Sequence, residues 1–328
     1  MRRVACLILA AICLLLVPTQ SFAWDNIGHM TVAYVAWQKL DPNAKARVTE
    51  LIKLNPLFAS KWDPLIPADI TGEKRDMYLF MIAATWPDQI KRMSTVYLCN
   101  GNFHNNTDTP PPDEDPTLNV GYDDLCIHKY WHFEDVSLGT PVHPTPDING
   151  DVKIELFTTA LTSVATDPVK SYDLVWLEHL VGDIHQPLHC VTRYSASNPT
   201  GDQGGNKIKT KTPSGELHGF WDGLIGKNTA TLFTDAQLAE TMGSQLPKLS
   251  LKDAKLAADP VSDHWVMESF TLAQSKVYVA PIGPEWGPYA ITPTYQAAAA
   301  KVAKKRVTFA GIRLANLLNA AFRTTRPA

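Results

Sequence analysis

Residues 172–189 read Tyr-Asp-Leu-Val-Trp-Leu-Glu-His-Leu-Val-Gly-Asp-Ile-His-Gln-Pro-Leu-His. Apolar residues recur at helical spacing in the first half of this stretch, which predicts a helix that carries His179 and Asp183. These two residues are four positions apart and therefore project from the same helix face. Pro187 cannot continue a helix, so His189 is expected in the turn beyond it. The chain is organised around this helix and the turn that ends it.

The polar residues of the stretch suggest a metal site. Three of the ten histidines in the chain lie between positions 179 and 189. Imidazole nitrogen and carboxylate oxygen form a borderline-soft ligand set that suits zinc. A surface or helix-capping role explains His179 and Asp183 equally well when this pair is considered alone. Other parts of the sequence are needed to distinguish a metal site from a surface or capping role.

The same His-x-x-x-Asp spacing recurs elsewhere in the chain. His104 and Asp108 lie in a segment rich in Pro, Asn and Asp, where helical spacing has no meaning, so we discard this pair. His218 and Asp222 belong to Glu-Leu-His-Gly-Phe-Trp-Asp, a short helical pattern after a glycine-rich turn at residues 201–206. A second His/Asp pair on a helix favours metal binding over coincidence.

Composition indicates an ordinary globular chain. The 328 residues are 45% hydrophobic and 19% charged, which gives ample material for a large core. No repeat or long linker divides the sequence, so we expect one domain over residues 24–328. Helical patterns cover residues 27–40, 73–84, 152–164, 261–277 and 294–322, and another helix begins at Asp41-Pro42. Residues 208–215 give the only clear strand pattern, a small β-hairpin. The fold class is mainly α, a single multi-helix bundle with long loops.

The first 23 residues have the pattern of a secretory signal peptide. Arg2 and Arg3 precede an apolar run from Val4 to Val17, and Ser-Phe-Ala at residues 21–23 forms a cleavage site. The run is too short for a membrane span of about 20 residues. We therefore expect an exported protein, periplasmic or secreted, that begins at Trp24 and has no transmembrane segment.

Net charge limits the kinds of partner. The formal charge is −3, and removal of Arg2 and Arg3 makes it more negative. This argues against a strongly basic surface of the kind that DNA-packaging proteins use. If the protein acts on nucleic acid, the attraction has to be local, and bound metal ions supply such attraction.

Three cysteines follow the signal segment. Cys99 and Cys126 flank a long loop and form the expected disulfide, which an oxidising compartment permits. Cys190 is the odd residue and directly follows His189. For such a cysteine, a buried free thiol is a commoner role than a metal ligand.

Three further residues have a chemical and a structural interpretation that local sequence does not separate. A free α-amine at Trp24 can bind a metal together with the carbonyl oxygen of the same residue. His29 lies at the start of a helix, and Asp88 follows a proline at a helix break. Each of the two is equally a ligand or a structural residue.

Two other places suggest contact with a substrate. Lys91 is a phosphate contact or a solvated charge. Residues 130–135, Tyr-Trp-His-Phe-Glu-Asp, place polar groups in an aromatic cluster. Phe133 can stack on a nucleobase and Asp135 can accept its amino hydrogens, although core packing is the commoner fate of such a phenylalanine.

These features occur together in one known family. The chain contains, in order, Trp24-x4-His29, Trp-Pro-Asp88, His132-Phe, His179-x3-Asp183-x-His-Gln-Pro-Leu-His189, Gly-Asp-x-Gly-Gly-Asn206 and Leu-His218-x3-Asp222. This set resembles the zinc-dependent single-strand nucleases of fungi, plants and bacteria, and it spans nearly the whole chain after residue 23. The resemblance implies a largely helical fold of the zinc phospholipase and nuclease type, and we expect a bacterial member.

The resemblance also implies three zinc ions. The expected ligands of the first ion are Asp88, His132, His179 and Asp183; those of the second are Trp24, His29 and the bridging Asp183; those of the third are His189, His218 and Asp222. Nine ligands leave positions open for water and phosphate. His185 is not a ligand in this scheme and is assigned a supporting hydrogen-bond role.

The implied activity is endonucleolytic hydrolysis of single-stranded DNA and RNA to 5′-phosphorylated products, with a 3′-nucleotidase activity. Zinc lowers the pKa of bound water and neutralises the phosphate. Asp88 is expected to orient the water, and Lys91 and Asn206 to stabilise the charge of the transition state. Phe133 and Asp135 match the base-binding pair of the family, which favours unpaired bases. We expect a monomer.

Two alternatives stay open. The segment between Asp88 and His132 is longer than in fungal members and contains both loop cysteines, which leaves the substrate groove undefined. A bacterial zinc phospholipase C has a similar three-zinc set and N-terminal tryptophan, although it tends to carry glutamate where Asp222 stands. A periplasmic zinc-sequestering protein is the non-enzymatic alternative, but the chain lacks long histidine-rich tracts.

Overall fold

Helix α6, Asp167–Asp183, lies near the centre of the computed structural model, which describes residues 24–92 and 128–323. A proline stands in its first turn, where no intrahelical N–H bond is needed. Every residue from Ser171 to Asp183 is buried, so this part of the helix is covered on all sides. It contacts α1 (Asn26–Trp37), α2 (Pro42–Lys53), α4 (Trp86–Arg92) and α5 (Gly150–Thr162). The helix predicted for this stretch is confirmed, and it is the core helix of the fold.

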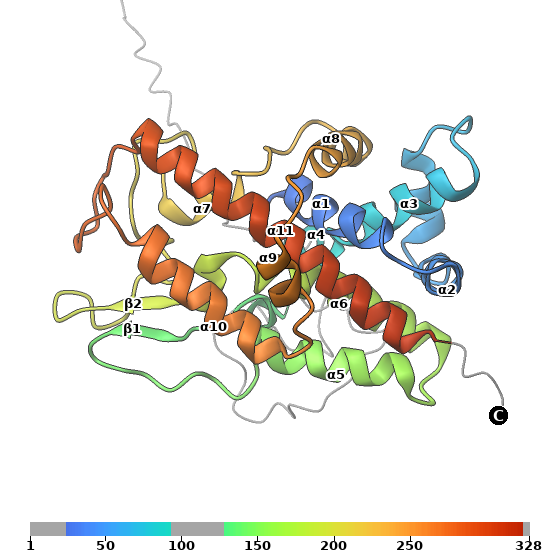
Figure 1. Cartoon of the computed structure of the whole chain (residues 1–328), viewed down its shortest axis with the longest axis horizontal. Coiled ribbons are helices and arrows are strands. Elements are labelled where there is room, and N and C mark those ends of the chain that lie inside the picture. The colour runs from blue at the N-terminus through green and yellow to red at the C-terminus, as the bar shows by residue number, and fades with distance from the viewer. Residues whose placement is uncertain (1–23, 93–127, 324–328) are drawn as a thin grey trace, which may run out of the picture.

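Helix α11, Pro293–Ala321, is the longest described helix and crosses the molecule over α1 and α6 (Figure 1). Thr292 caps its first turn, since its hydroxyl accepts a hydrogen bond from the backbone N–H of Tyr295 at 3.2 Å. Gly311 permits a close approach to α1, because a Cβ atom there would lie 2.5 Å from Cβ of Val35. Helix α11 therefore holds α1 and α6 in one packing unit.

The remaining helical segments surround this unit. Those before α6 are η1 (Phe58–Trp62), η2 (Asp63–Leu65), α3 (Gly72–Ala83) and η3 (Lys129–His132). Those after it are η4 (Pro187–Cys190), α7 (Leu217–Asp222), α8 (Leu232–Ser244), α9 (Leu251–Ala257), α10 (Ser262–Leu272) and η5 (Ala273–Val277). The helical segments predicted around α6 are confirmed to within one turn at their ends, with residues 261–277 divided into α10 and η5, whereas α6 itself begins five residues before the pattern at Tyr172. Asp41 caps α2 as predicted, with Oδ1 accepting from the N–H of Ala44 at 2.8 Å.

The strands differ from the prediction. Strands β1 (Ser137–Gly139) and β2 (Thr192–Tyr194) form a small parallel sheet in which Ser137 pairs with Thr192. The hairpin predicted at residues 208–215 is reduced to one antiparallel bridge, between Lys209 and Glu216. The hairpin keeps a bond across its turn, from the N–H of Thr210 to the carbonyl of Gly215 at 3.0 Å, and it also pairs with a distant segment, since the N–H of Lys209 donates to the carbonyl of Trp286 at 2.7 Å. The pairing with residues 286–289 could not be predicted, because a strand pattern depends only on neighbouring positions in the sequence.

Two apolar clusters make up the interior, and a shared residue, Leu224, packs against both. The larger cluster contains Trp24, Trp86 and Trp176, and the smaller one contains Leu188 and Trp221. The helices therefore pack as a single domain. Within residues 24–92 and 128–323, no helix combines the length and hydropathy needed to span a bilayer.

Candidate metal centre

The last turn of α6 brings His179 and Asp183 together as their spacing predicts. Nε2 of His179 lies 3.3 Å from Oδ2 of Asp183, and neither side chain is exposed to solvent. Oδ2 of Asp183 also lies 2.9 Å from Nδ1 of His132, the last residue of η3. His132 and His179 approach each other to 3.0 Å between Nδ1 and Nε2. Residues 47 positions apart in sequence thus point their ring nitrogens at one carboxylate.

Helices α1 and α4 complete this first cluster. Nε2 of His29, on α1, lies 3.3 Å from Oδ1 of Asp183. Asp88 lies in the first turn of α4, and its Oδ1 is 3.6 Å from Nε2 of His179. Oδ2 of Asp88 is 3.9 Å from Nε2 of His29. The first cluster therefore consists of His29, Asp88, His132, His179 and Asp183, with Asp183 between the three rings.

Trp24 lies beside this cluster. Its indole Nε1 donates to the carbonyl of Gly182 at 3.0 Å, and the whole side chain is buried. The next residue, Asp25, donates its backbone N–H to the carbonyl of Asp222 at 3.2 Å. The chain at Trp24 is thus held between the end of α6 and the end of α7.

A second cluster consists of His189, His218 and Asp222. His189 is carried by η4, beyond the end of α6, and the other two residues lie on α7. The Nε2 atoms of His189 and His218 are 3.0 Å apart, and Nε2 of His218 is 3.7 Å from Oδ2 of Asp222. All three side chains are buried.

Backbone carbonyls fix the orientation of three of these rings. Nδ1 of His179 donates to the carbonyl of Ala84 at 2.8 Å. Nδ1 of His218 donates to Gly204 at 2.7 Å, and Nδ1 of His189 donates to His132 at 2.6 Å. A carbonyl oxygen only accepts, so each Nδ1 carries a proton and each Nε2 is the nitrogen that faces its cluster. This is the arrangement that metal-binding histidines adopt.

The charges of the first cluster attract a cation. Burial lowers the pKa of His29 to about 4, and the neighbouring His179 adds to this effect. Burial also lowers the pKa of His179, but the carboxylates of Asp183 and Asp88 outweigh it and raise that pKa to about 9. Burial alone would raise the pKa of Asp183, yet the histidines hold it well below its usual value. The carboxylate therefore stays ionised inside the protein and needs a positive partner.

The residues of both clusters fit a metal ion. Nε2 of His29 and Oδ1 of Asp183 face each other, yet neither has a hydrogen-bond partner among the described residues. Buried polar atoms are rarely left in this state. Three groups of ligand atoms, each within 4.8 Å of one another, can converge on an ion: His29/Asp88/His179, His132/His179/Asp183 and His189/His218/Asp222. Nitrogen and oxygen donors in groups of three suit zinc.

Short connections tie the two clusters together. Besides the bond from His189 to the carbonyl of His132, Nε2 of Gln186 donates to Oδ1 of Asp222 at 2.8 Å. Oε1 of Gln186 accepts from the N–H of Leu188 at 2.6 Å and so shapes the turn before His189. The supporting roles of Gln186, Ala84 and Gly204 were not predicted, because a side-chain pattern does not reveal which carbonyls a ring will meet.

A comparison with known families identifies the chain. The family model described as S1/P1 Nuclease matches residues 24–323. The chain belongs to the S1/P1 nuclease family. Endonuclease 3 of Arabidopsis thaliana is 25% identical over 322 residues, which cover 93% of this chain and 91% of the relative. Nuclease S1 of Aspergillus oryzae is 26% identical over 279 residues, which cover 78% of this chain and 77% of the relative. These relatives come from a plant and a fungus, and they give no support to the expectation of a bacterial member.

In this S1/P1 nuclease family member, Asn206 lies at the edge of the second cluster. Its Nδ2 atom is 3.3 Å from Nδ1 of His218 and donates to the carbonyl of Gln203 at 2.7 Å. The loop before it has positive φ at Gln203, Gly204 and Gly205, in agreement with the permissive turn predicted there. Gly204 also lies against a cluster ring, because a Cβ atom at this position would be 3.3 Å from Nδ1 of His218.

The expected base-binding residues lie beside the first cluster. Phe133 directly follows His132 and is partly buried against the larger core. Asp135 is partly exposed, and its Oδ1 accepts from the hydroxyl of Thr192 at 2.5 Å. In this S1/P1 family member, His132 ends η3, and Phe133 and Asp135 follow it on the short segment that leads to β1.

The other predicted residues are Lys91 and the three cysteines, of which the structure describes the side chain of Cys190 alone. Lys91 belongs to α4, but its side chain is outside the described part of the protein. Cys99 and Cys126 also lie outside the described residues, so their pairing stays a prediction. Cys190 is a buried free thiol in the larger core, as expected, and its Sγ donates to the carbonyl of Ile184 at 3.3 Å.

Proposed function

We propose that this chain is an exported three-zinc phosphodiesterase that hydrolyses single-stranded DNA and RNA to 5′-phosphorylated products and acts on 3′-nucleotides. The observation that carries the proposal is the pair of buried His/Asp clusters joined by the turn between Asp183 and His189. Membership in the S1/P1 nuclease family supports the reaction class.

The proposed zinc ligands are the cluster residues and Trp24. In the first cluster, Asp88, His132, His179 and Asp183 hold one ion, and Trp24, His29 and Asp183 hold its mate. The second cluster, His189, His218 and Asp222, holds a third ion. Support comes from three rings whose Nδ1 atoms donate to backbone carbonyls, which makes Nε2 the nitrogen available to a metal ion that displaces any proton there. Bound zinc supplies Lewis-acid neutralisation of the phosphate and lowers the pKa of water.

The side chains around the clusters have separate roles in this proposal. Asp88 orients the attacking water, because its carboxylate is the most accessible one of the first cluster. Asn206 projects its amide next to the second cluster, where it can donate to a phosphate oxygen. Lys91 is the proposed third contact to the phosphate, from the last turn of α4.

Substrate preference rests on Phe133 and Asp135. A phenylalanine face stacks on any unpaired base, and a carboxylate accepts hydrogen bonds from an exocyclic amine. Both residues are only partly buried, and the backbone fixes them next to the cluster residue His132. A base held in a duplex cannot enter such a stack, so single strands are the preferred substrate.

The test uses protein that starts at Trp24. Removal of zinc with a chelator should abolish hydrolysis of a single-stranded oligonucleotide, and added zinc should restore it. Parallel assays with the matching duplex, a 3′-nucleotide and phosphatidylcholine assign the substrate class. Cleavage that persists after verified zinc removal would overturn the zinc proposal, and preferential hydrolysis of phosphatidylcholine would identify a phospholipase C instead.

A further inference from the structure

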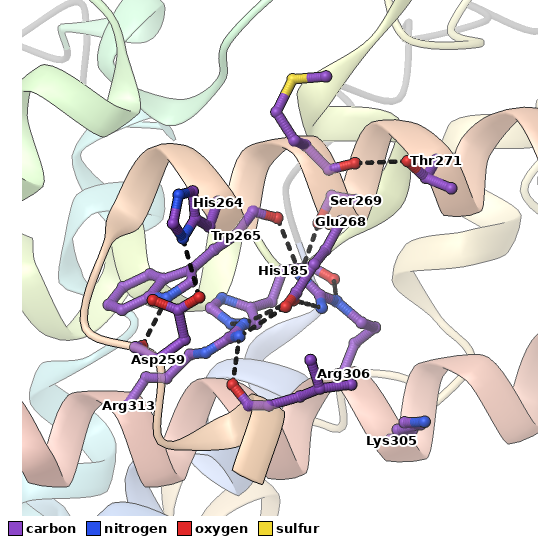
Figure 2. A network of polar contacts seen from close by, with 12 residues as sticks. His185, Asp259, His264, Trp265, Glu268, Ser269, Thr271, Lys305, Arg306 and Arg313 are labelled. Carbon is purple, nitrogen blue, oxygen red and sulfur yellow. Dashed lines mark hydrogen bonds and ion pairs between the residues drawn. The ribbon is translucent and has the colours of Figure 1, made fainter. Parts of the chain in front are cut away.

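Two buried arginines of α11 meet the turn that connects the metal clusters (Figure 2). The side chains of Arg306 and Arg313 are 3% and 0% exposed. Glu268 of α10 lies between them and is their carboxylate partner. Buried charges are stable only when they are paired and hydrogen-bonded, so a network of this kind has a defined geometry.

The charges are joined through both oxygens of the carboxylate. Arg313 donates from Nη1 to Oε2 of Glu268 and from Nη2 to Oε1, each at 2.8 Å. Arg306 donates from Nη1 to Oε2 at 2.5 Å. A bidentate pair of this kind fixes the plane of the guanidinium group. The Nη2 atom of Arg313 also donates a hydrogen bond to the carbonyl of Leu256 at 2.9 Å.

His185 connects this ion network to the turn. Nη1 of Arg313 donates to Nε2 of His185 at 2.8 Å, and Nδ1 of His185 donates to the carbonyl of Val181 at 2.7 Å. Because a guanidinium only donates and a carbonyl only accepts, both ring nitrogens are used and the tautomer is fixed. His185 is thus a link between two helices and lies outside both metal clusters.

The backbone of the turn is held from the same side. Nε of Arg306 donates to the carbonyl of His185 at 3.1 Å, and the hydroxyl of Ser269 donates to the carbonyl of Ile184 at 2.6 Å. Nη2 of Arg306 in turn donates to the Ser269 hydroxyl at 2.8 Å. The last carbonyls of a helix lack intrahelical partners, so these bonds decide the path of the chain beyond α6.

That path determines where the two clusters lie. Asp183 directly precedes Ile184 and His185, the two residues whose carbonyls are bonded in this way. His189 lies four positions after His185. Gln186, within the same turn, donates to Asp222 of the second cluster at 2.8 Å. A shift of the turn would therefore move the ligands of the second cluster relative to Asp183.

We propose that Arg313, acting through His185, is a positioning residue that sets the spacing between the two metal clusters. We call Arg313 and His185, together with Arg306, Glu268 and Ser269, the clamp. The inference rests on the proposed function only in that it takes both clusters to bind zinc. A clamp of this kind fixes distances during turnover, so its loss should affect zinc retention and kcat more than substrate binding.

The matched control is Arg75, which makes a similar number of bonds away from the clusters. Its Nη2 and Nε atoms donate to Oδ1 of Asp63 at 2.7 and 3.0 Å. Its Nη1 atom donates to the carbonyls of Ile66, Pro67 and Ile70 at 3.2, 3.1 and 3.2 Å. Loss of Arg75 removes a fold-stabilising arginine but leaves the turn beyond α6 untouched.

The experiment compares zinc-loaded wild type with His185→Phe, Arg313→Met and Arg75→Met. His185→Phe keeps a ring in place and leaves the Arg313–Glu268 pair intact, so it separates the link from the ion pair. For each protein we would measure zinc content, the rate of zinc release to a chelator, kcat and KM on an oligonucleotide, and thermal unfolding.

We expect both clamp variants to release zinc about tenfold faster and to lose about tenfold in kcat, with KM changed much less. Arg75→Met should lower the unfolding temperature while zinc release and kcat stay at wild-type values. If His185→Phe releases zinc and turns over like wild type, the inference is wrong, whatever the fate of Arg313→Met. Wild type that binds no zinc, or binds zinc without cleaving nucleic acid, would instead refute the proposed function.

Discussion

Gly182 of α6 lies directly against the imidazole ring of His29 on α1: a Cβ atom at position 182 would be 2.8 Å from Nδ1 of that ring. Real Cβ atoms do not approach a ring nitrogen so closely, so any side chain here displaces His29. The same ring stacks on His179, with centroids 3.8 Å apart and an interplanar angle of 13°. Absence of a side chain at one helix position thus places a residue of the first cluster.

Gly182→Ala should therefore remove zinc selectively. Alanine favours the helix by about 1 kcal/mol, so the variant should stay folded while His29 moves out of the first cluster. We expect the zinc content to fall by one ion per molecule, with His189, His218 and Asp222 still loaded. Elemental analysis of purified protein measures this, and wild-type zinc content would show that the ring has room to adapt.

Asp183→Asn should empty the first cluster. The Asp183 carboxylate lies 2.9 Å from His132 and 3.3 Å from both His29 and His179, and an amide cannot supply its charge. We expect activity to fall by more than about 100-fold, the upper range for residues that only support a ligand.

The matched control is Asp235→Asn on α8. Asp235 is also buried, and it accepts from Asn26 at 3.0 Å and from the N–H of Thr229 at 2.7 Å. It belongs to neither cluster. Assays of zinc content and oligonucleotide hydrolysis should separate the two variants, and equal losses in both would argue against a specific role for Asp183.

One extra residue before Trp24 should impair the first cluster. Trp24 is buried and its indole is bonded to Gly182, so an added residue converts the α-amine into an amide at a fixed place. An amide nitrogen is a far weaker zinc ligand than an amine. Mass spectrometry verifies each N-terminus, and zinc titration compares the two forms. Identical zinc stoichiometry and rate would rule out chelation by the terminus.

Phe133→Ala should weaken substrate binding and leave zinc in place. Stacking of one base contributes about 1–3 kcal/mol, so the KM for an oligonucleotide should rise about tenfold or more. Phe58→Ala is the control, because Phe58 also packs partly buried against the larger core but belongs to η1. An unchanged KM in Phe133→Ala would assign Phe133 to the core alone.

Glu268 gives the stability of the protein a defined pH dependence. Burial raises the pKa of Glu268, but hydrogen bonds and charges from Arg313 and Arg306 outweigh it and hold this pKa below its usual value. The ionised carboxylate therefore stabilises the fold fully above the unfolded pKa of about 4.3. This contribution is lost as the pH falls through the folded pKa.

Glu268→Gln should lower the free energy of unfolding at neutral pH by about 3 kcal/mol, since two buried arginines lose their anionic partner. It should also flatten the fall in stability below about pH 5. Urea unfolding of zinc-free wild type and variant over a pH series measures both effects. If the stability of both proteins falls equally as the pH is lowered, the pKa of Glu268 is not depressed in the folded state.

Local features of the site were predictable because helix geometry alone produces them. His179 and Asp183 share a face through their spacing of four, and so do His218 and Asp222. Pro187 begins η4 after α6 has ended, and His189 follows in that turn as expected. The mainly helical fold followed from the apolar period for the same reason. The loop cysteines and the side chain of Lys91 stay predictions.

Contacts between distant segments could not be predicted from spacing. The short hairpin at residues 208–215 also pairs with residues 286–289, and the parallel sheet of β1 and β2 joins segments 55 positions apart at Ser137 and Thr192. Strand pairing of this kind depends on where the surrounding helices place each segment, and no local pattern records it.

The sequence by itself determined which residue types can bind zinc and which of them share a helix face, because those properties depend on positions a few residues apart. Tertiary structure alone decided that His29, Asp88 and His132 converge on Asp183, that backbone carbonyls orient the rings, and that two arginines of α11 clamp the turn between the clusters. The physical reason is that these contacts arise from helix packing, where a missing Cβ at Gly182 or a buried charge at Arg313 fixes distances between remote parts of the chain.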